Sequence, residues 1–202
     1  MSADGRILRV FRFRPERPEF DGFLRAQMVP DIRLSPGLLD VHVGRRGPDQ
    51  GDDRLVATVW ADRASMVAAV GDSLETSTFH PERLVDTIDR TLLTLDLRVL
   101  LSFEGSEPPA LLRFFRGEVR PGELDAYVDE TRAGTLADAE AGRGPCMLYL
   151  AIDPPDRFVT LSLWPSWQAI ETATGGDIRR PLTTKDTSRL IGMDIAHYEV
   201  VV

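Results

Sequence analysis

The feature that most constrains this chain of 202 residues is that its two halves resemble each other. A shift of 104 positions places Leu8–Arg12 over Leu112–Arg116, and Val56–Trp60 over Thr160–Trp164. The same shift aligns the segments expected to form the first strand, the first helix, the third strand and the second helix. A chain with such a repeat is expected to fold as two copies of one supersecondary unit.

The two copies differ by small changes in loop length. The second expected strand aligns at a shift of 107 and the last at about 102, as short insertions in loops would produce. Gly, Ser and Pro residues in the segment 102–109 break both helix and strand patterns. We therefore expect a first repeat over residues 1–101, a linker over residues 102–109 and a second repeat over residues 110–202.

Each half is predicted to have the order β-α-β-β-α-β. Alternating apolar residues predict strands in the first half, over 6–13, 38–45, 54–61 and 94–101. A first helix is expected to start near Pro18 and to be limited by Pro30 and Pro36, and Asp62 is a suitable N-cap for the second. Helical spacing of apolar residues favours a further helix over 81–93. In the second half the first helix lacks the internal proline and is expected to extend to Ala141.

This order is that of the ferredoxin-like split βαβ unit. The third strand has apolar residues on both faces, since Leu55, Ala57 and Val59 alternate with Val56 and Trp60. A sheet with one wet face would alternate more cleanly, so the face without helices needs a cover. The predicted fold class is α+β, with two tandem ferredoxin-like repeats whose antiparallel sheets pack as an intrachain pseudo-dimeric α/β barrel.

The composition excludes several classes of protein. The net charge of −8 is unfavourable for nucleic-acid or anionic-membrane binding, and Cys146 is the only cysteine, so no intrachain disulfide can form. There is no signal peptide or apolar stretch of about 18 residues, and we expect a cytoplasmic protein. No P-loop, dinucleotide fingerprint or zinc-ligand spacing occurs, and neither a cofactor nor a metal is expected.

Three motifs carry a resemblance to a known family. The third strands end in Val59-Trp60-Ala61-Asp62 and Leu163-Trp164-Pro165-Ser166, each followed by a capped helix, and the chain closes with Ala196-His197-Tyr198-Glu199-Val200. In these features each half resembles the dimeric α/β-barrel superfamily, specifically the antibiotic-biosynthesis-monooxygenase-like domains. The resemblance covers nearly the whole chain, twice, so the protein is similar to two fused protomers.

The resemblance implies two kinds of activity. Some members are cofactor-independent oxygenases of polycyclic aromatic substrates, and others degrade haem with Asn, Trp and His in the pocket. This chain has no asparagine, and Ala69 and Ala173 stand where the haem-degrading branch has Trp. Only His80 falls near the place of the haem-ligating His, so haem binding or degradation is the less favoured of the two.

Four residues are candidates for catalysis. His42 and its counterpart Tyr149 lie within the second strand of each half, and both side chains can donate or accept a proton. Arg9 and Arg113 occupy matched positions in the first strands, where a guanidinium could stabilise an enolate or phenolate. The structural alternatives are a hydrogen-bonded core His and Tyr, and arginines paired with carboxylates.

Four further residues are candidates for ligand binding: Trp60, Trp164, His80 and His197. The two tryptophans could stack on a flat aromatic ligand or could instead be apolar plugs at the end of the barrel. His197 and Tyr198 lie on opposite faces of the last strand, so only one of them can line a given cavity.

We therefore predict a small-molecule-binding protein, with a cofactor-independent monooxygenase acting on an aromatic or polyketide-like substrate as the leading function. Such an enzyme removes a proton from an electron-rich substrate, and the resulting carbanion reacts with dioxygen directly. The alternative is a non-catalytic ligand-binding or assembly module. The fused unit is expected to be a monomer or a homodimer, with no nucleic-acid or membrane partner.

Overall fold

The computed structural model describes residues 5–15, 20–72, 91–102, 108–182 and 187–201, with the backbone alone for 91–102. His80 and most of the linker predicted over 102–109 lie outside these residues. Contacts divide the chain into two compact units, one of residues 1–97 and 198–202 and one of residues 98–197. These units match the predicted repeats except at the ends of the two closing strands, and the predicted domain boundaries stay a prediction.

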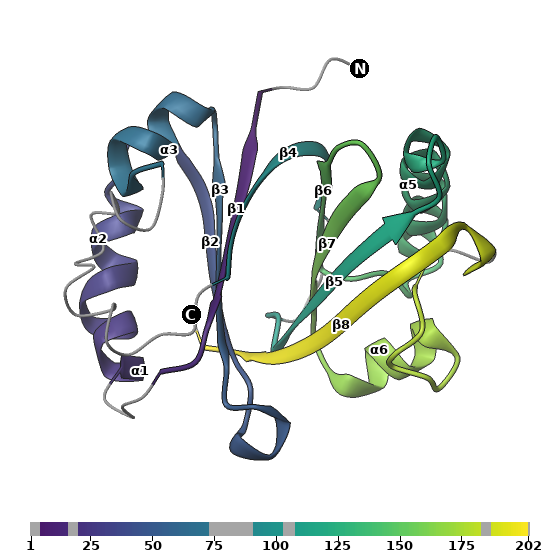
Figure 1. Ribbon diagram of the computed structural model, residues 1–202. Coiled ribbons are helices and arrows are strands. Elements are labelled where there is room, and N and C mark those ends of the chain that lie inside the picture. The colour runs from purple at the N-terminus through teal and green to yellow at the C-terminus, as the bar shows by residue number, and fades with distance from the viewer. Residues whose placement is uncertain (1–4, 16–19, 73–90, 103–107, 183–186, 202) are drawn as a thin grey trace. The chain divides into compact units, whose positions relative to one another are not determined.

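The first repeat has the predicted element order (Figure 1). Its elements are β1 (Ile7–Phe13), α1 (Phe20–Phe23), a π-helical turn (Leu24–Met28), α2 (Val29–Arg33), β2 (Leu38–Arg45), β3 (Arg54–Trp60), α3 (Arg63–Val70) and β4 (Thr91–Ser102). The helix predicted over 81–93 is wrong at its end, because residues 91–93 belong to β4, and its remainder lies outside the described residues. Leu92 and Leu93 pair with Phe11 and Val10 of β1, so strand pairing overrides the helical spacing of this segment.

The second repeat has the same order. Its elements are β5 (Leu111–Val119), α5 (Leu124–Glu140), β6 (Met147–Asp153), β7 (Arg157–Trp164), α6 (Trp167–Thr174) and β8 (Leu190–Val200). The longer first helix predicted for this half is confirmed, since α5 ends at Glu140. The predicted α+β fold class of two ferredoxin-like repeats is therefore confirmed.

Strand order and register are the same in the two repeats. The order is β4-β1-β3-β2 in the first and β8-β5-β7-β6 in the second. Leu8 pairs with Val59 and Leu112 pairs with Leu163, two pairs related by the 104-residue shift. Pairing within the second hairpins also confirms the shift of 107, because Val41 faces Thr58 as Leu148 faces Ser162.

The first helical run of the first repeat passes through Pro30, contrary to prediction, but ends at Arg33, before Pro36. The π-helical turn Leu24–Met28 precedes it, and Pro30 lies in the first turn of α2, which continues to Arg33. A proline has no N–H to donate, and the first turn of a helix is where that donor is not needed. The widened turn before it lets the chain restart a helix without a break.

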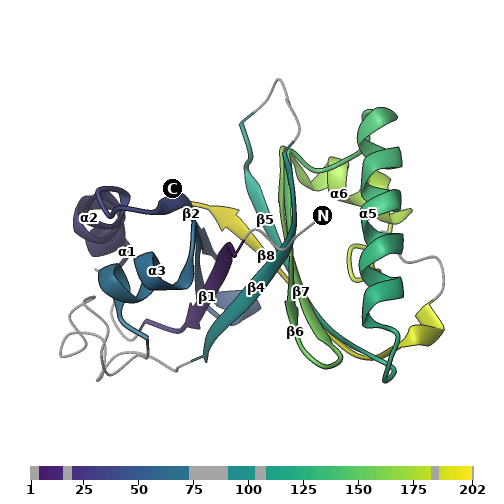
Figure 2. The same cartoon turned by 90° about the horizontal axis from the view of Figure 1, so that it is seen from above.

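Each sheet carries its helices on one face, as Figure 2 shows for each repeat. In the first repeat this side is an apolar core in which Leu24, Met28 and Ile32 pack against strand residues such as Val43 and Val56. In the second, α5 packs against β6 and β7 through Tyr127 and Phe158, whose rings stack with centroids 4.0 Å apart. The helix-facing side of each strand is therefore fixed by these contacts.

Two local motifs are built alike in both repeats. The Trp60 indole donates to Thr58 Oγ1 and the Trp164 indole donates to Ser162 Oγ, each over 2.9 Å. Asp62 caps α3 by accepting from the Ser65 amide, and Ser166 caps α6 by accepting from the Ala169 amide. Each buried indole N–H is thus satisfied by the hydroxyl two residues before it.

Arg54 joins the first sheet to its helix. Its side chain is 6% exposed, and it donates to both carboxylate oxygens of Asp21 in α1 over 2.7 and 3.1 Å. It also pairs with Asp52 over 3.0 Å. Although burial disfavours the charge, these hydrogen bonds and charges raise the pKa of Arg54 above its usual value.

Tyr198 is the buried anchor by which the end of β8 joins the first compact unit. Its hydroxyl donates to Asp53 Oδ2 over 2.7 Å, and the neighbouring Val200 pairs with Gly44 of β2. Burial raises the pKa of Tyr198 well above its usual value, Arg12 opposes this, and the hydrogen bond to Asp53 adds to it. The phenol therefore keeps its proton at a pH where an unfolded tyrosine would lose it.

Replacing Arg54 with Met is expected to lower the free energy of unfolding by about 2–3 kcal/mol. It removes both hydrogen bonds to Asp21, which keeps only the longer ion pair with Arg45 over 3.8 Å. The control is Arg63→Met, which removes an exposed pair with Asp72 and is expected to cost about 0–0.5 kcal/mol. Urea unfolding measures both. Equal effects of the two substitutions would contradict the structural role of Arg54.

Tyr198→Phe is expected to lower the free energy of unfolding by about 2 kcal/mol at pH 8, because a buried hydrogen bond to a carboxylate is lost. The protonated phenol of Tyr198 stabilises the folded state fully below the pKa of an unfolded tyrosine, about 10. This stabilisation is lost as the pH rises toward the higher pKa of Tyr198 in the folded state. The gap between wild type and variant should therefore narrow between about pH 9 and pH 11 in urea unfolding. An unchanged gap would contradict the raised pKa of Tyr198.

Candidate functional site

The matched arginines of the first strands lie on the helix-facing side of each sheet. Arg9 is 6% exposed and Arg113 is 1% exposed. Arg9 donates to the carbonyl of Gly71, directly after α3, and Arg113 donates to the carbonyl of Arg180, beyond α6, over 2.7 Å. Each guanidinium therefore binds a backbone carbonyl that follows the second helix of its own repeat.

The two guanidinium groups differ in the charge around them. Burial lowers the pKa of Arg9, and the carboxylate of Asp72 opposes this. Burial lowers the pKa of Arg113 to about 10, and in the described part of the chain only the phenol of Tyr127 opposes it. The residue at the position of Asp72 in the second repeat is Gly176. Arg113 is therefore a buried cation without a compensating carboxylate among the described residues.

Further polar atoms lie on the same side of the second sheet. The Nε atom of Arg113, the hydroxyl of Thr160 in β7 and the hydroxyl of Thr131 in α5 are buried and have no hydrogen-bond partner among the described residues. Tyr127 lies one turn before Thr131 on the buried face of α5. We call Arg113, Tyr127, Thr131 and Thr160 the Arg113 cluster. Buried polar atoms without partners in a native fold are uncommon, and water or a ligand is the usual explanation.

The first repeat has apolar residues at the corresponding places. Thr160 pairs with Phe115 of β5, and at the equivalent pairing Val56 faces Phe11 of β1. The buried face of the first helical run carries Leu24, Met28 and Ile32, whereas that of α5 carries Tyr127, Thr131 and Thr135. In the first repeat Thr58 lies beside Arg9, but its hydroxyl accepts from the Trp60 indole. Only the second interface therefore offers buried hydroxyl groups that have no partner among the described residues.

His197 belongs to the same side of the second sheet. It is buried, and its ring lies 5.2 Å from the ring of Trp167 in α6. Its strand β8 is the neighbour of β5, which carries Arg113. The structure thus brings two of the predicted site residues, Arg113 and His197, to the helix-facing side of adjacent strands.

His42 and Tyr149 lie on the other face of their sheets. His42 pairs with Ala57 and Tyr149 with Leu161, whereas the helix-facing Val41 and Leu148 pair with Thr58 and Ser162. The Nε2 atom of His42 lies 3.1 Å from Asp40 Oδ2, and Tyr149 is 1% exposed. The two pairs of catalytic candidates therefore occupy opposite faces, and the catalytic role of His42 and Tyr149 stays a prediction.

Trp60 and Trp164 are fully buried with their indole N–H groups occupied by Thr58 and Ser162. This is the environment that the structural alternative predicts for them, and a role in stacking on a ligand stays a prediction. His80 lies outside the described residues, so its predicted role in ligand binding also stays a prediction.

Sequence reasoning overlooked the hydroxyl groups of the Arg113 cluster. A signal was present in the alignment of the repeats, because the 104-residue shift places Thr160 over Val56 and Gly176 over Asp72. Tyr127 and Thr131 were harder to find, since the π-helical turn changes which positions of the first helical run face the sheet.

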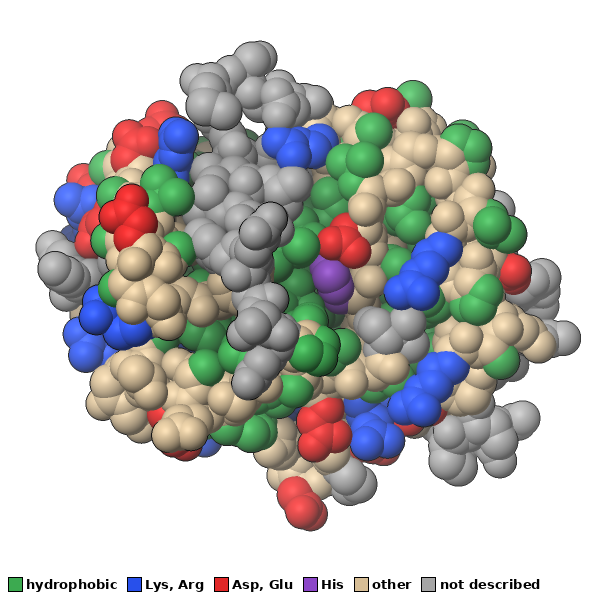
Figure 3. Space-filling model, turned by 180° about the vertical axis from the view of Figure 1, so that it is seen from behind, with side chains coloured by type: hydrophobic (Ala, Val, Ile, Leu, Met, Phe, Trp, Pro, Cys, Tyr) green, Lys and Arg blue, Asp and Glu red, His purple; other side chains and the backbone are tan. Residues whose placement is uncertain are grey.

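Three further observations concern the surface charge, metal-binding groups and membrane-spanning helices. On the face shown in Figure 3, acidic and basic side chains are interspersed and form no basic stripe. No cluster of His, Cys, Asp and Glu suited to a metal ion occurs among the described residues. Nor does the described part of the chain contain a helix long and apolar enough to span a membrane. The predicted cytoplasmic location stays a prediction.

Comparison with known proteins gives a result by structure alone. No protein-family model matches the sequence, and no curated protein sequence matches it. Structural similarity, in contrast, extends over almost the whole chain.

Three solved structures illustrate this similarity. One, from Fusobacterium nucleatum, is named a "putative monooxygenase", with a TM-score of 0.73 at 10% identity over 98% of this chain and 93% of that one. An anthrone oxidase-like protein has a TM-score of 0.64 at 16% identity over 100% of this chain and 94% of that one. A ferredoxin-fold protein related to antibiotic biosynthesis monooxygenases, from Listeria monocytogenes, has a TM-score of 0.56 at 13% identity over 95% and 94%. The chain therefore shares its fold with these monooxygenase-like proteins.

Proposed function

We propose that the second repeat binds a small acidic aromatic molecule between its sheet and helices and oxygenates it without a cofactor. The observation that carries this proposal is the buried guanidinium of Arg113, which has no compensating carboxylate among the described residues. A buried cation is costly unless an anion accompanies it, and an enolate or phenolate oxygen provides one. The monooxygenase-like and anthrone oxidase-like neighbours support oxygenation as the reaction class.

The groups around Arg113 suit the recognition of an oxygenated ring. The Nε atom of Arg113 and the hydroxyls of Thr131 and Thr160 are donors aimed at no described partner. The stacked rings of Tyr127 and Phe158 supply an aromatic wall beside them. A planar molecule with acidic oxygens would pair its oxygens with the donors and its carbon skeleton with the rings.

His197 is the proposed proton acceptor. It lies on the strand adjacent to that of Arg113, and its contact with Trp167 orients the imidazole. Removal of a C–H proton leaves an electron pair that is delocalised onto the substrate oxygen, where Arg113 stabilises the negative charge.

The remaining steps use dioxygen as the second substrate. The electron pair of the carbanion forms a C–O bond with dioxygen, which yields a peroxide after protonation. Loss of the second hydrogen from this carbon breaks the O–O bond and releases water. A CH₂ group thus becomes a carbonyl, and one molecule of dioxygen supplies the carbonyl oxygen and the oxygen of water.

Anthrone is the probe that tests this proposal. We expect the purified protein to consume dioxygen in a one-to-one ratio with anthrone, and Arg113→Met to lower the rate by about 10²–10³-fold. Arg116→Met is the matched control, because Arg116 has the same charge on the same strand but alternates to the opposite face. It is expected to keep the wild-type rate.

Stability separates a functional role of Arg113 from a structural one. Replacing an uncompensated buried cation with an apolar side chain is expected to leave the free energy of unfolding unchanged or to raise it by about 1 kcal/mol. A loss of several kcal/mol in Arg113→Met would assign the arginine to the core instead. A wild-type protein that neither binds nor oxidises anthrone would contradict the proposal, whereas binding without dioxygen uptake would identify a non-catalytic binding module.

A further inference from the structure

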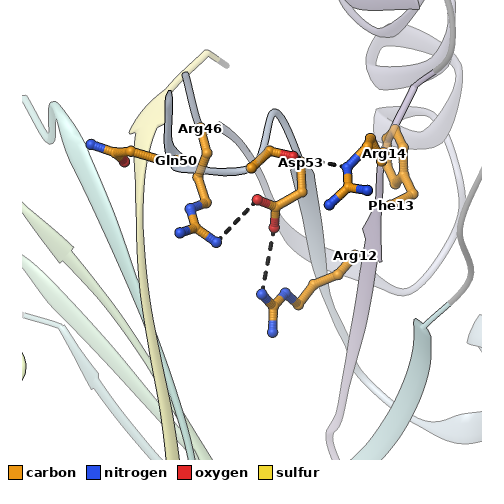
Figure 4. A pocket seen from close by; sticks show the side chains of 7 residues that line it. Arg12, Phe13, Arg14, Arg46, Gln50 and Asp53 are labelled. Atoms are coloured by element: carbon orange, nitrogen blue, oxygen red, sulfur yellow. Dashed lines mark hydrogen bonds and ion pairs between the residues drawn. The ribbon is translucent and has the colours of Figure 1, made fainter. Parts of the chain in front are cut away.

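The first repeat contains a second group of arginines, beside the loop that connects β2 to β3. A pocket of about 340 Å³ lies there, lined by Arg12, Arg14, Arg46, Gln50 and Asp53, with Phe13 on one side. Figure 4 shows the side chains of Arg12, from β1, and Arg46, from the hairpin, pointing at Asp53, while Arg14 points at the backbone of the hairpin loop. All of these residues belong to the first compact unit.

Charge is unbalanced in this pocket. Three guanidinium groups line it, and Asp53 is the one carboxylate among the lining residues. The neighbouring carboxylate of Asp52 is paired with Arg54, outside the pocket. Among the described residues the lining therefore carries an excess of positive charge that an anion would neutralise.

Asp53 organises the arginines around it. Its Oδ1 atom lies 3.1 Å from Arg46 and its Oδ2 atom 3.5 Å from Arg12, while the hydroxyl of Tyr198 donates to Oδ2 over 2.7 Å. Oδ2 therefore accepts hydrogen bonds, whereas Oδ1 faces Arg46 as an ion pair and accepts no hydrogen bond from a described residue. The side chains of Arg12 and Arg46 are 21% and 25% exposed, so this arrangement is half-buried.

Some donors in the pocket stay available to a ligand. The Nε atom of Arg46 is buried and has no hydrogen-bond partner among the described residues. Arg14 is held by one bond from its Nε to the carbonyl of Gly51 over 2.9 Å, and its terminal nitrogens make no hydrogen bond to a described residue. Guanidinium groups in such an arrangement match the oxygens of a tetrahedral oxyanion.

We propose that this pocket binds a small oxyanion of the phosphate class, either inorganic phosphate or a phosphate monoester. The arginines take the phosphoryl oxygens, and Gln50 adds an amide donor at the rim. This site lies in the repeat that lacks the Arg113 cluster, and its occupancy is independent of the proposed oxygenation.

Calorimetric titration of the full-length protein with inorganic phosphate tests this site. We expect binding at sub-millimolar concentration that weakens with added salt, and a loss of about 10-fold in affinity in each of Arg14→Gln and Arg46→Gln. Arg25→Gln is the control, because it removes the same charge from an exposed position on the π-helical turn. It should change the affinity less than about two-fold.

A second ligand and a comparison of variants complete this titration experiment. Phenyl phosphate, titrated in parallel, distinguishes the sources, because tighter binding than phosphate indicates a monoester and equal or weaker binding indicates the free ion. Arg14 is exposed, so Arg14→Gln is expected to fold normally even if Arg46→Gln does not. The proposal is overturned if neither phosphate nor phenyl phosphate binds, or if chloride at equal ionic strength binds as well, or if Arg14→Gln and Arg25→Gln behave alike.

Discussion

A charged guanidinium placed in the first strand of each repeat, facing the helices, is the constraint on which the functional site depends. Both Arg9 and Arg113 are removed from water and donate to a carbonyl beyond the second helix of their own repeat. Hydrogen bonds to neutral carbonyls do not cancel a charge, so each arginine still favours a nearby anion. In the first repeat Asp72 supplies it, and in the second a glycine stands at that position.

The two repeats thus share one scaffold but differ in the side chains of one interior face. Strand register, the indole-to-hydroxyl bonds of Trp60 and Trp164, and the caps of α3 and α6 are alike in the two copies. The differences concern the layer between sheet and helices, where the second copy carries the hydroxyls of Thr131 and Thr160 and the first copy has apolar residues at the corresponding places. A stable scaffold with one altered interior face is what a protein needs if only one copy is to bind a ligand.

The sequence alone was sufficient for the architecture because strand pairing repeats at the same spacing in both halves. The shifts of 104 and 107 predicted pairings such as Leu112 with Leu163 and Leu148 with Ser162. The local sequence pattern was a poorer guide where strand pairing or an irregular helical turn determines the secondary structure. Leu92 and Leu93 have helical spacing but form part of β4, and the π-helical turn allows the helical run to continue past Pro30.

The candidate site was predictable only in part. Arg113 and His197 were identified because charged or titratable residues in strands require an explanation, but His42 and Tyr149 could not be assigned to a face shared with them from alternation within single strands. The pocket around Asp53 depends on a hairpin conformation in which Asp52 has a φ of 52° and Tyr198 arrives from the far end of the chain. Neither property follows from local sequence.

The most direct measurement is a crystal structure of the protein with anthrone bound in the absence of dioxygen. The account predicts a substrate oxygen within hydrogen-bond distance of Arg113, at about 2.7–3.0 Å from its Nε or terminal nitrogens, on the helix-facing side of the second sheet. Anthrone bound elsewhere, with Arg113 hydrogen-bonded only to protein or water, would contradict it.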